Sequence, residues 1–139
     1  MLDFKKELSK YNLDSTNSVI IGSGPLQALG IRESKDIDIV VNNQMFEKLS
    51  LLKNFRKGEY PEGHYYLKNE VFQIGDRLLI SKININKTYN HIFKNSFVVN
   101  GLRYMKLDFV LKIKKLLQRP KDIHDIKLIE EYLRSENQV

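Results

Sequence analysis

Residues 20–41 read IIGSGPLQALGIRESKDIDIVV, with a short apolar run at each end and a glycine-rich segment between them. The runs that end at Ile21 and Val41 are rich in β-branched residues, which is typical of buried strands. Between them, Pro25 suits the first turn of a helix and Gly30 suits its exit. The stretch therefore predicts a strand, a glycine-containing turn, a short helix and a second strand.

Two carboxylates lie in the second predicted strand, residues 36–41. Asp36 and Asp38 are two residues apart, so their side chains project from the same face. Two adjacent negative charges are stabilised by a cation, and hard oxygen ligands of this kind suit Mg²⁺ or Mn²⁺. The sequence thus predicts a site for a divalent ion that bridges nucleotide phosphates. Alternatively, the two aspartates are the polar face of a half-exposed strand.

The turn Gly22-Ser23-Gly24 lies between the first predicted strand and the helix. Its backbone N–H groups, the Ser23 hydroxyl and the helix dipole are suited to holding a phosphate. The alternative is an ordinary glycine-rich turn with a serine cap. A dinucleotide-binding motif would need glycine in place of Gln27, and the spacing of a P-loop is absent. The predicted phosphate site is therefore of neither kind.

The Gly-Ser turn, the short helix and the Asp-x-Asp strand together resemble the nucleotidyltransferase superfamily related to DNA polymerase β. The likeness is greatest to its small single-domain members, the minimal nucleotidyltransferases. Residues 112–126, KIKKLLQRPKDIHDI, are similar to the C-terminal "K…RpKDl.D" helix pair of many such bacterial proteins. The resemblance implies a twisted mixed sheet flanked by helices. It also implies Mg²⁺-dependent transfer of a nucleoside monophosphate from an NTP to an acceptor.

The resemblance also implies roles for individual residues. Gly22 and Ser23 match the turn that holds the triphosphate, and Asp36 and Asp38 match the metal-binding pair. Arg119, Lys121 and Asp122 match a basic-acidic cluster of the family, in which Lys121 contacts the triphosphate. Arg32 and Lys35, just before the acidic pair, are further candidates for phosphate contact. Alternatively, these cations are solvated.

The family has a third carboxylate on a nearby strand, which ligates the metal and accepts the proton of the acceptor hydroxyl. Glu70 is our candidate for this role, and Asp76 is the second choice. Alternatively, Glu70 is a solvated charge at a strand edge and Asp76 an ordinary turn residue. An amide such as Gln73 at the third position would ligate a metal poorly.

The remainder of the chain predicts a mixed α/β domain. Apolar spacing predicts helices over residues 2–11, 43–54, 107–117 and after Pro120. Short β-branched or aromatic runs predict strands at residues 64–67, 70–74, 78–80, 97–99 and 102–104, the last two joined by Asn100-Gly101 as a hairpin turn. On helix 107–117, Lys112, Lys114 and Lys115 are predicted to form a solvated basic face, with nucleic-acid contact as the alternative.

Composition bounds the possible functions. A length of 139 residues, with 42% hydrophobic and 29% charged, predicts one globular domain. The absence of cysteine excludes disulfide scaffolds, cysteine nucleophiles and thiolate metal sites. The first residues are too charged for a signal peptide, and no run reaches the roughly 18–20 apolar residues of a membrane span. We therefore expect a cytoplasmic protein that does not associate with membranes.

The net charge of +6 and the pI near 9.4 favour an anionic partner. The expected substrate is an NTP, and the acceptor is RNA such as a tRNA end, a protein hydroxyl or a small molecule. The resemblance also implies a partner protein, because small members of the family often act in toxin–antitoxin pairs. The alternative function is a catalytically weak or inactive module of the same fold that binds a nucleotide, RNA or a partner protein.

Overall fold

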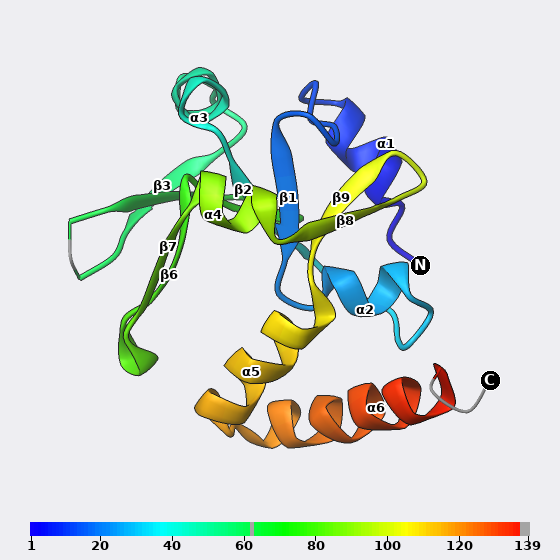
Figure 1. Cartoon of the computed structure of the whole chain (residues 1–139). Helices are drawn as coiled ribbons and strands as arrows, with labels where there is room; N and C mark the ends of the chain where they lie inside the picture. The colour runs from blue at the N-terminus through cyan, green and yellow to red at the C-terminus, as the bar shows by residue number, and fades with distance from the viewer. Residues whose placement is uncertain (62, 137–139) are drawn as a thin grey trace.

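A seven-stranded mixed sheet forms the centre of the computed structural model, which describes residues 1–61 and 63–136 (Figure 1). The strand order in this sheet is β3-β4-β5-β2-β1-β9-β8. A separate hairpin is formed by β6 and β7. The strands are β1 (Ser18–Ile21), β2 (Ile37–Val41), β3 (Arg56–Glu59), β4 (Tyr65–Lys68), β5 (Phe72–Gly75), β6 (Arg77–Ile80), β7 (Ile85–Thr88), β8 (Ser96–Val99) and β9 (Leu102–Met105).

Helices lie on both faces of the sheet, so the predicted mixed α/β fold is confirmed. They are α1 (Phe4–Ser9), α2 (Gly24–Ala28), α3 (Asn43–Ser50), α4 (Tyr89–Lys94), α5 (Leu107–Leu117) and α6 (Pro120–Glu136), with a 3-10 turn η1 (Ser81–Ile83) at the tip of the hairpin. Helix α1 begins after Asp3, whose side chain accepts a hydrogen bond from the backbone N–H of Lys6.

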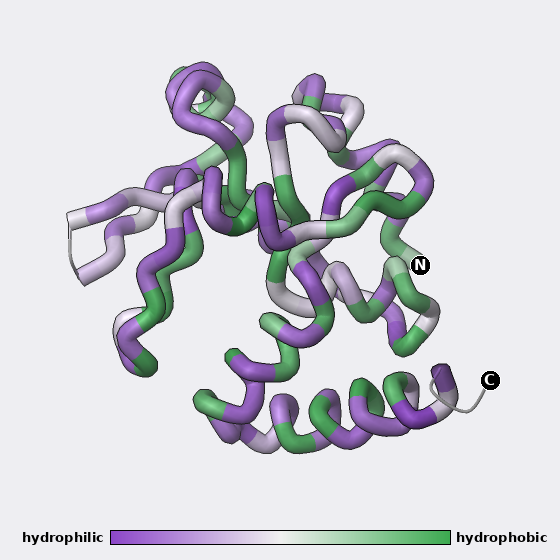
Figure 2. The backbone as a smooth tube through the Cα atoms, in the orientation of Figure 1, coloured by the Kyte–Doolittle hydropathy of each residue, from purple (hydrophilic) through white to green (hydrophobic). Residues whose placement is uncertain are grey.

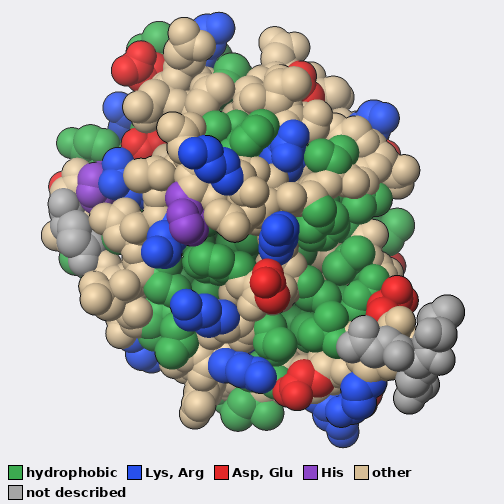
Figure 3. All heavy atoms as spheres, viewed as in Figure 1, with side chains coloured by type: hydrophobic (Ala, Val, Ile, Leu, Met, Phe, Trp, Pro, Cys, Tyr) green, Lys and Arg blue, Asp and Glu red, His purple; other side chains and the backbone are tan. Residues whose placement is uncertain are grey.

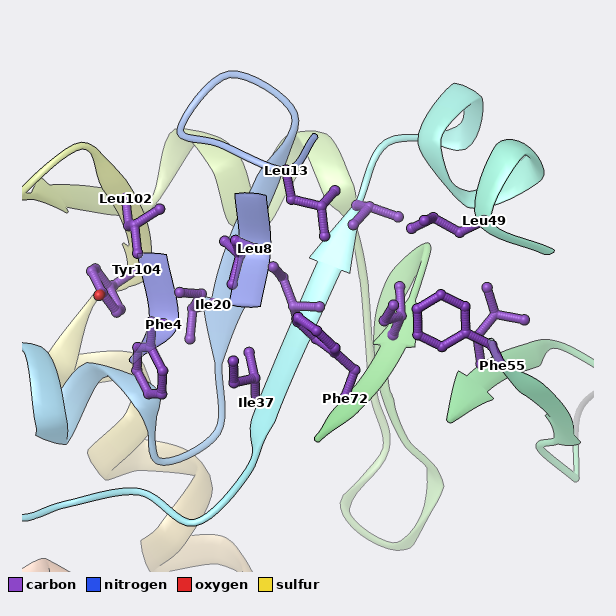
Figure 4. Close-up of a cluster of buried hydrophobic side chains, with 14 residues drawn as sticks. Phe4, Leu8, Leu13, Ile20, Ile37, Leu49, Phe55, Phe72, Leu102 and Tyr104 are labelled. Atoms are coloured by element: carbon purple, nitrogen blue, oxygen red, sulfur yellow. The ribbon is translucent and has the colours of Figure 1, made fainter. Parts of the chain in front are cut away.

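The two halves of the core follow from the alternation of side chains along the central strands. Ile37 and Ile39 of β2 point to the face covered by α1 and α3, where Phe4, Leu8 and Phe72 complete a buried cluster (Figure 4). The opposite face packs against α2, α4, α5, α6 and the β6–β7 hairpin. Figure 2 shows hydrophobic residues concentrated in the central strands, whereas the β3–β4 end is more hydrophilic. Because side chains alternate along β2, Asp38, which lies between Ile37 and Ile39, points to the face opposite to α1 and α3.

Pairing between the central strands sets the position of the predicted site. Strands β1 and β2 run antiparallel, whereas β2 and β5, and β1 and β9, run parallel. The last residue of β1 and the first residues of β2 consequently lie side by side at one end of these central strands. The Gly22-Ser23 turn and the acidic pair thus come from neighbouring strand ends.

The sequence predicted some connections better than others. Asn100 and Gly101 form the predicted two-residue hairpin, with positive φ angles of 50° and 80°. Strands β3 and β7 and helix α4 were not predicted, because RKGE and INKT lack the alternating apolar pattern of a strand and YNHIFK is only six residues long. Helix α3 ends at Ser50, earlier than the predicted residue 54.

Candidate functional site

Gly22 and Asp38 are in direct contact where the end of β1 lies beside the beginning of β2. Ile21 pairs with Asp38 in the antiparallel register, so the next residue, Gly22, turns over the carboxylate. Gly22 has a φ angle of +64°, and a Cβ atom built on it would lie 2.6 Å from Asp38 Oδ2. Only glycine therefore fits here, both for its backbone conformation and for the space left by Asp38.

We expect Gly22→Ala to destabilise the fold by about 2–3 kcal/mol, because it adds a steric conflict with Asp38 to the cost of a positive φ angle. Gly30→Ala is the matched control. Its φ angle is +72°, but no atom lies within 4 Å of the added Cβ. The control is expected to lose only about 1 kcal/mol in urea denaturation. Equal losses in the two variants would contradict the contact with Asp38.

The side chain of Asp38 is partly buried, whereas Asp36 is exposed. Burial raises the pKa of Asp38 to about 6, and the nearby charge of Asp36 adds to this effect. The positive charges of Lys121, Lys68 and Lys114 act in the opposite direction. Ile37, between the two aspartates, is completely buried on the other face, which places both carboxylates on the same side of β2.

Ser23 is tied to the loop that precedes the acidic pair. Its hydroxyl lies 2.7 Å from the hydroxyl of Ser34, and Ser34 Oγ donates to the backbone carbonyl of Asp36 at 2.9 Å. Since a hydroxyl has one proton, Ser23 must be the donor to Ser34. Ser23 makes no side-chain capping bond to α2. In this arrangement its hydroxyl fixes the turn, and only its lone pairs remain open to a further partner.

The three cations predicted to contact phosphate differ in their surroundings. Arg32 forms two hydrogen bonds with Asp125 of α6, Nε to Oδ1 at 2.7 Å and Nη2 to Oδ2 at 2.8 Å. Lys35 and Lys121 are exposed and have no ion-pair partner within residues 1–61 and 63–136. The positive charge of Lys121 acts to lower the pKa of Asp38, so this lysine lies near the carboxylate. Arg32 is therefore engaged with α6, whereas the two lysines are open to a ligand.

Gln73 occupies the position next to Asp38. In the parallel register of β2 and β5, Asp38 pairs with Gln73. Glu70 lies in an exposed turn before β5, and Asp76 follows β5 and pairs with Arg77 at 3.4 Å. Within the described ranges 1–61 and 63–136, no group of three or more His, Asp or Glu residues is arranged to hold a metal ion. The structure thus brings Gln73, rather than Glu70, beside the acidic pair.

Two carboxylates and one amide oxygen still fit one class of metal ion. Mg²⁺ is commonly held by one or two protein carboxylates, with water and substrate phosphates completing its coordination. Asp36 and Asp38 provide such a pair on one face, and a bound cation would offset the burial and the charge of Asp36 that raise the pKa of Asp38. The residues present are compatible with Mg²⁺ or Mn²⁺ that arrives together with a nucleotide.

A cavity of about 560 Å³ opens beside Asp38. The sheet contributes Asp38 and Gln73 to its lining, and the hairpin and the α5–α6 region contribute the cationic side chains of Arg77, Lys82, Lys114 and Arg119. Apolar side chains line the space between them, including Leu78, Met105 and Ile113. The volume is in the range of small-molecule sites, and the walls suit a ligand with both an anionic and an apolar part.

Lys114 belongs to a buried ionic network that sequence reasoning missed. Its Nζ lies 3.0 Å from Asp125 Oδ2 and 3.6 Å from Asp122 Oδ1, and Asp122 also binds Arg119 through Nε at 2.6 Å. Asp122 and Asp125 are only 0% and 2% exposed. The prediction of Lys114 as solvated was wrong. The available signal was its position on α5, one residue after Ile113 and three before Leu117, within the apolar stripe.

Hydrogen bonding decides the charge state of the two buried carboxyls. Burial alone would raise the pKa of Asp125, but hydrogen bonds from Arg32 and Lys114 outweigh it and lower the pKa below its usual value. Burial also acts to raise the pKa of Asp122, and hydrogen bonds from Arg119 outweigh it in the same way, so that this pKa is lowered too. The network therefore stays ionised at neutral pH and links α5 and α6 to the loop before β2.

No family model, curated protein or solved structure matches this chain. Each helix in the part of the chain that the structure describes is too short or too polar to cross a membrane.

Proposed function

We propose that this chain is a Mg²⁺- or Mn²⁺-dependent nucleotidyltransferase, which transfers a nucleoside monophosphate from an NTP to an acceptor hydroxyl. The observation that carries the proposal is the contact between the Gly22 turn and Asp38 in the lining of a cavity that also has cationic side chains. A glycine turn directly beside an acidic pair offers backbone N–H groups for phosphates and carboxylates for a metal ion within one small region.

Each residue of the site has a role in the proposed reaction. Asp36 and Asp38 would hold the divalent ion, which when bound supplies charge neutralisation for the triphosphate. The Gly22-Ser23 backbone would orient the phosphates, and Lys35 and Lys121 would attract them into the site. The acceptor oxygen forms a bond to the α-phosphorus while the bond to pyrophosphate breaks. The proton of the hydroxyl passes to solvent or to a neighbouring carboxylate.

One observation favours a second candidate function. Gln73 lies beside Asp38, where the family resemblance calls for a carboxylate, and an amide is a weaker metal ligand and cannot act as a base at neutral pH. The alternative is a module of the same fold that binds Mg-NTP without turnover.

Calorimetry with each Mg-NTP, followed by an assay for pyrophosphate release with RNA, protein and small-molecule acceptors, separates the two functions. The enzyme is expected to bind one NTP in a Mg²⁺-dependent way and to release pyrophosphate when an acceptor is present. Binding without release identifies the module. Absence of Mg²⁺-dependent binding for all NTPs would overturn both functions. Gln73→Asp is a useful third arm, because a carboxylate at this position is expected to tighten metal binding by about tenfold.

A further inference from the structure

Positive charge is concentrated in one continuous part of the chain. Residues 77–121 contain eleven Lys and Arg residues but a single acidic residue, Asp108. The remainder of the chain has twelve Lys and Arg residues against sixteen Asp and Glu residues, and is therefore net negative. The net charge of +6 is thus the difference between a strongly basic segment and a mildly acidic remainder.

This segment forms one region of the surface. It comprises the β6–β7 hairpin, α4, the β8–β9 hairpin and α5, and α4 contacts both β6 and β7. Figure 3 shows Lys and Arg side chains spread over the face made by the β6–β7 hairpin, α4 and α5, among hydrophobic patches and fewer acidic groups. We call this surface the basic face. Its β6–β7 hairpin, α4 and α5 cover the side of the sheet opposite to α1 and α3.

Most of the cations on the basic face have no anionic partner in the described residues. Arg77, Lys114 and Arg119 form ion pairs, and Arg103 stacks on Phe93 with its Cζ 3.9 Å from the ring centroid. The other seven are lysines, which are exposed or partly exposed and form no ion pair within residues 1–61 and 63–136. Their charge is therefore available to a ligand.

Exposed lysines lie on α5 and just before it. Lys112 and Lys115 are three residues apart and share the exposed side of the helix, and Lys106 precedes its first turn. With eleven residues, α5 is about 16 Å long, which matches about five phosphates at the 3.4 Å spacing of one nucleic-acid strand. Positive charges near both ends of the helix, from Lys106 and from Lys112 and Lys115, fit a repeating polyanion better than a single phosphate.

A small hollow lies in the same surface. It has a volume of about 170 Å³ and is lined by Asn95, Lys106, Asp108, Phe109 and Lys112. Phe109 is partly exposed there, and the ring of His91 lies 6.4 Å from it, edge to face. An aromatic side chain between lysines is the combination that proteins use to stack an unpaired base while they hold its backbone.

We propose that the basic face, and α5 in particular, binds a single-stranded nucleic acid. The lysines contact the phosphates, Phe109 stacks on a base, and exposed asparagines such as Asn86 and Asn90 donate to phosphate or sugar oxygens. A membrane surface fits less well, because the lysines of the β6–β7 hairpin and α4 alternate with asparagines, and the apolar side of α5 is buried in the core. The inference does not depend on nucleotide transfer, because Lys106, Phe109 and Lys112 lie outside the cavity beside Asp38 and the binding needs neither NTP nor metal.

Fluorescence anisotropy with a labelled single-stranded RNA of about 12 nucleotides, without metal or NTP, tests this surface. The variant is Lys112→Glu/Lys115→Glu. Lys48→Glu/Lys53→Glu is the matched control, because it makes the same change in net charge at exposed positions on α3 and just after it. We expect the α5 variant to lose affinity at least tenfold and its log–log salt slope to fall by about 1.4, with little change in the control.

Two further arms make the outcome decisive. Asp108→Asn removes the single acidic group of the basic face and is expected to raise the affinity about two- to threefold. Equal losses of RNA affinity in the α5 and α3 variants would overturn the proposal, because they would mean that only the net charge of the protein attracts the RNA. Tighter binding to polyglutamate, to anionic vesicles or to duplex DNA than to single-stranded RNA and DNA would also overturn it. Both lysine variants are expected to keep the Mg-NTP binding of the natural chain, so this result and that of the proposed function are separable.

Discussion

The Asp36→Asn/Asp38→Asn variant is expected to lose nucleotide transfer by at least about a hundredfold and, at the same time, to unfold at a higher urea concentration than the natural chain at pH 7. The loss follows from removing both carboxylates that would hold the metal ion. The gain in stability comes from Asp38, whose burial raises its pKa to about 6. A residue that serves packing alone would not combine these two effects.

The direction of the stability effect follows from proton linkage. The carboxyl of Asp38 has a pKa near 3.8 in the unfolded chain and about 6 in the folded one, so the folded state binds the proton more tightly. Its favourable contribution is complete below about pH 4 and disappears as the pH rises through 6. Above pH 6, an ionised and poorly hydrated Asp38 costs stability relative to a neutral amide. We expect the Asp38→Asn change to recover about 1–2 kcal/mol at about pH 7.5.

Urea denaturation at about pH 7.5 and about pH 4.5, together with labelled NTP transfer, checks both parts. The stability advantage of the variant should shrink by more than half at the lower pH. Asp14→Asn is the control, because a hydrogen bond from Thr16 lowers the pKa of Asp14 and its replacement should not stabilise the fold. Retention of transfer in the double variant would contradict the proposed function. A loss of stability at the higher pH would contradict the electrostatic environment of Asp38.

The central part of the site could be predicted from local patterns in the sequence. The strand at Ile37–Val41, the turn at Gly22 and the hairpin turn at Asn100 and Gly101 each follow from residues within a few positions of one another. That the turn and the acidic pair lie on neighbouring strand ends could also be predicted, because strands close in sequence are usually adjacent. The antiparallel register that pairs Ile21 with Asp38 was not predicted.

Long-range pairing could not be predicted in the same way. Gln73 comes to lie beside Asp38 only because β5 adds to β2 in parallel, in a register that depends on where β5 begins. A shift of one residue would have turned Gln73 to the other face. The burial of Lys114 likewise depends on α6, whose carboxylates Asp122 and Asp125 replace the water that a lysine in an amphipathic helix would otherwise need. Neither partner is apparent from α5 alone.

The Asp125→Ala variant is expected to be destabilised by about 3–5 kcal/mol, more than the Gly22→Ala variant. Asp125 is 2% exposed and joins Arg32, before β2, to Lys114, on α5. Without it, Lys114 keeps only Asp122 at 3.6 Å, and its ammonium group remains buried without a close hydrogen-bonding partner. Loss of one member of a buried ion network costs far more than the network contributes, because the remaining charges cannot be rehydrated.

The matched control for Asp125→Ala is Glu7→Ala, which removes an exposed ion pair of similar length, 2.9 Å to Lys10 on the surface of α1. Pairs of this kind contribute about 0–1 kcal/mol, so the control should unfold close to the natural chain. Urea denaturation at pH 7 measures both. The loss in Asp125→Ala should also be smaller at about pH 3 than at pH 7, because the lowered pKa of Asp125 makes its contribution disappear only in acid. Equal, small losses in the two variants would mean that α6 is held to the sheet by apolar packing around Ile129 and not by Asp125.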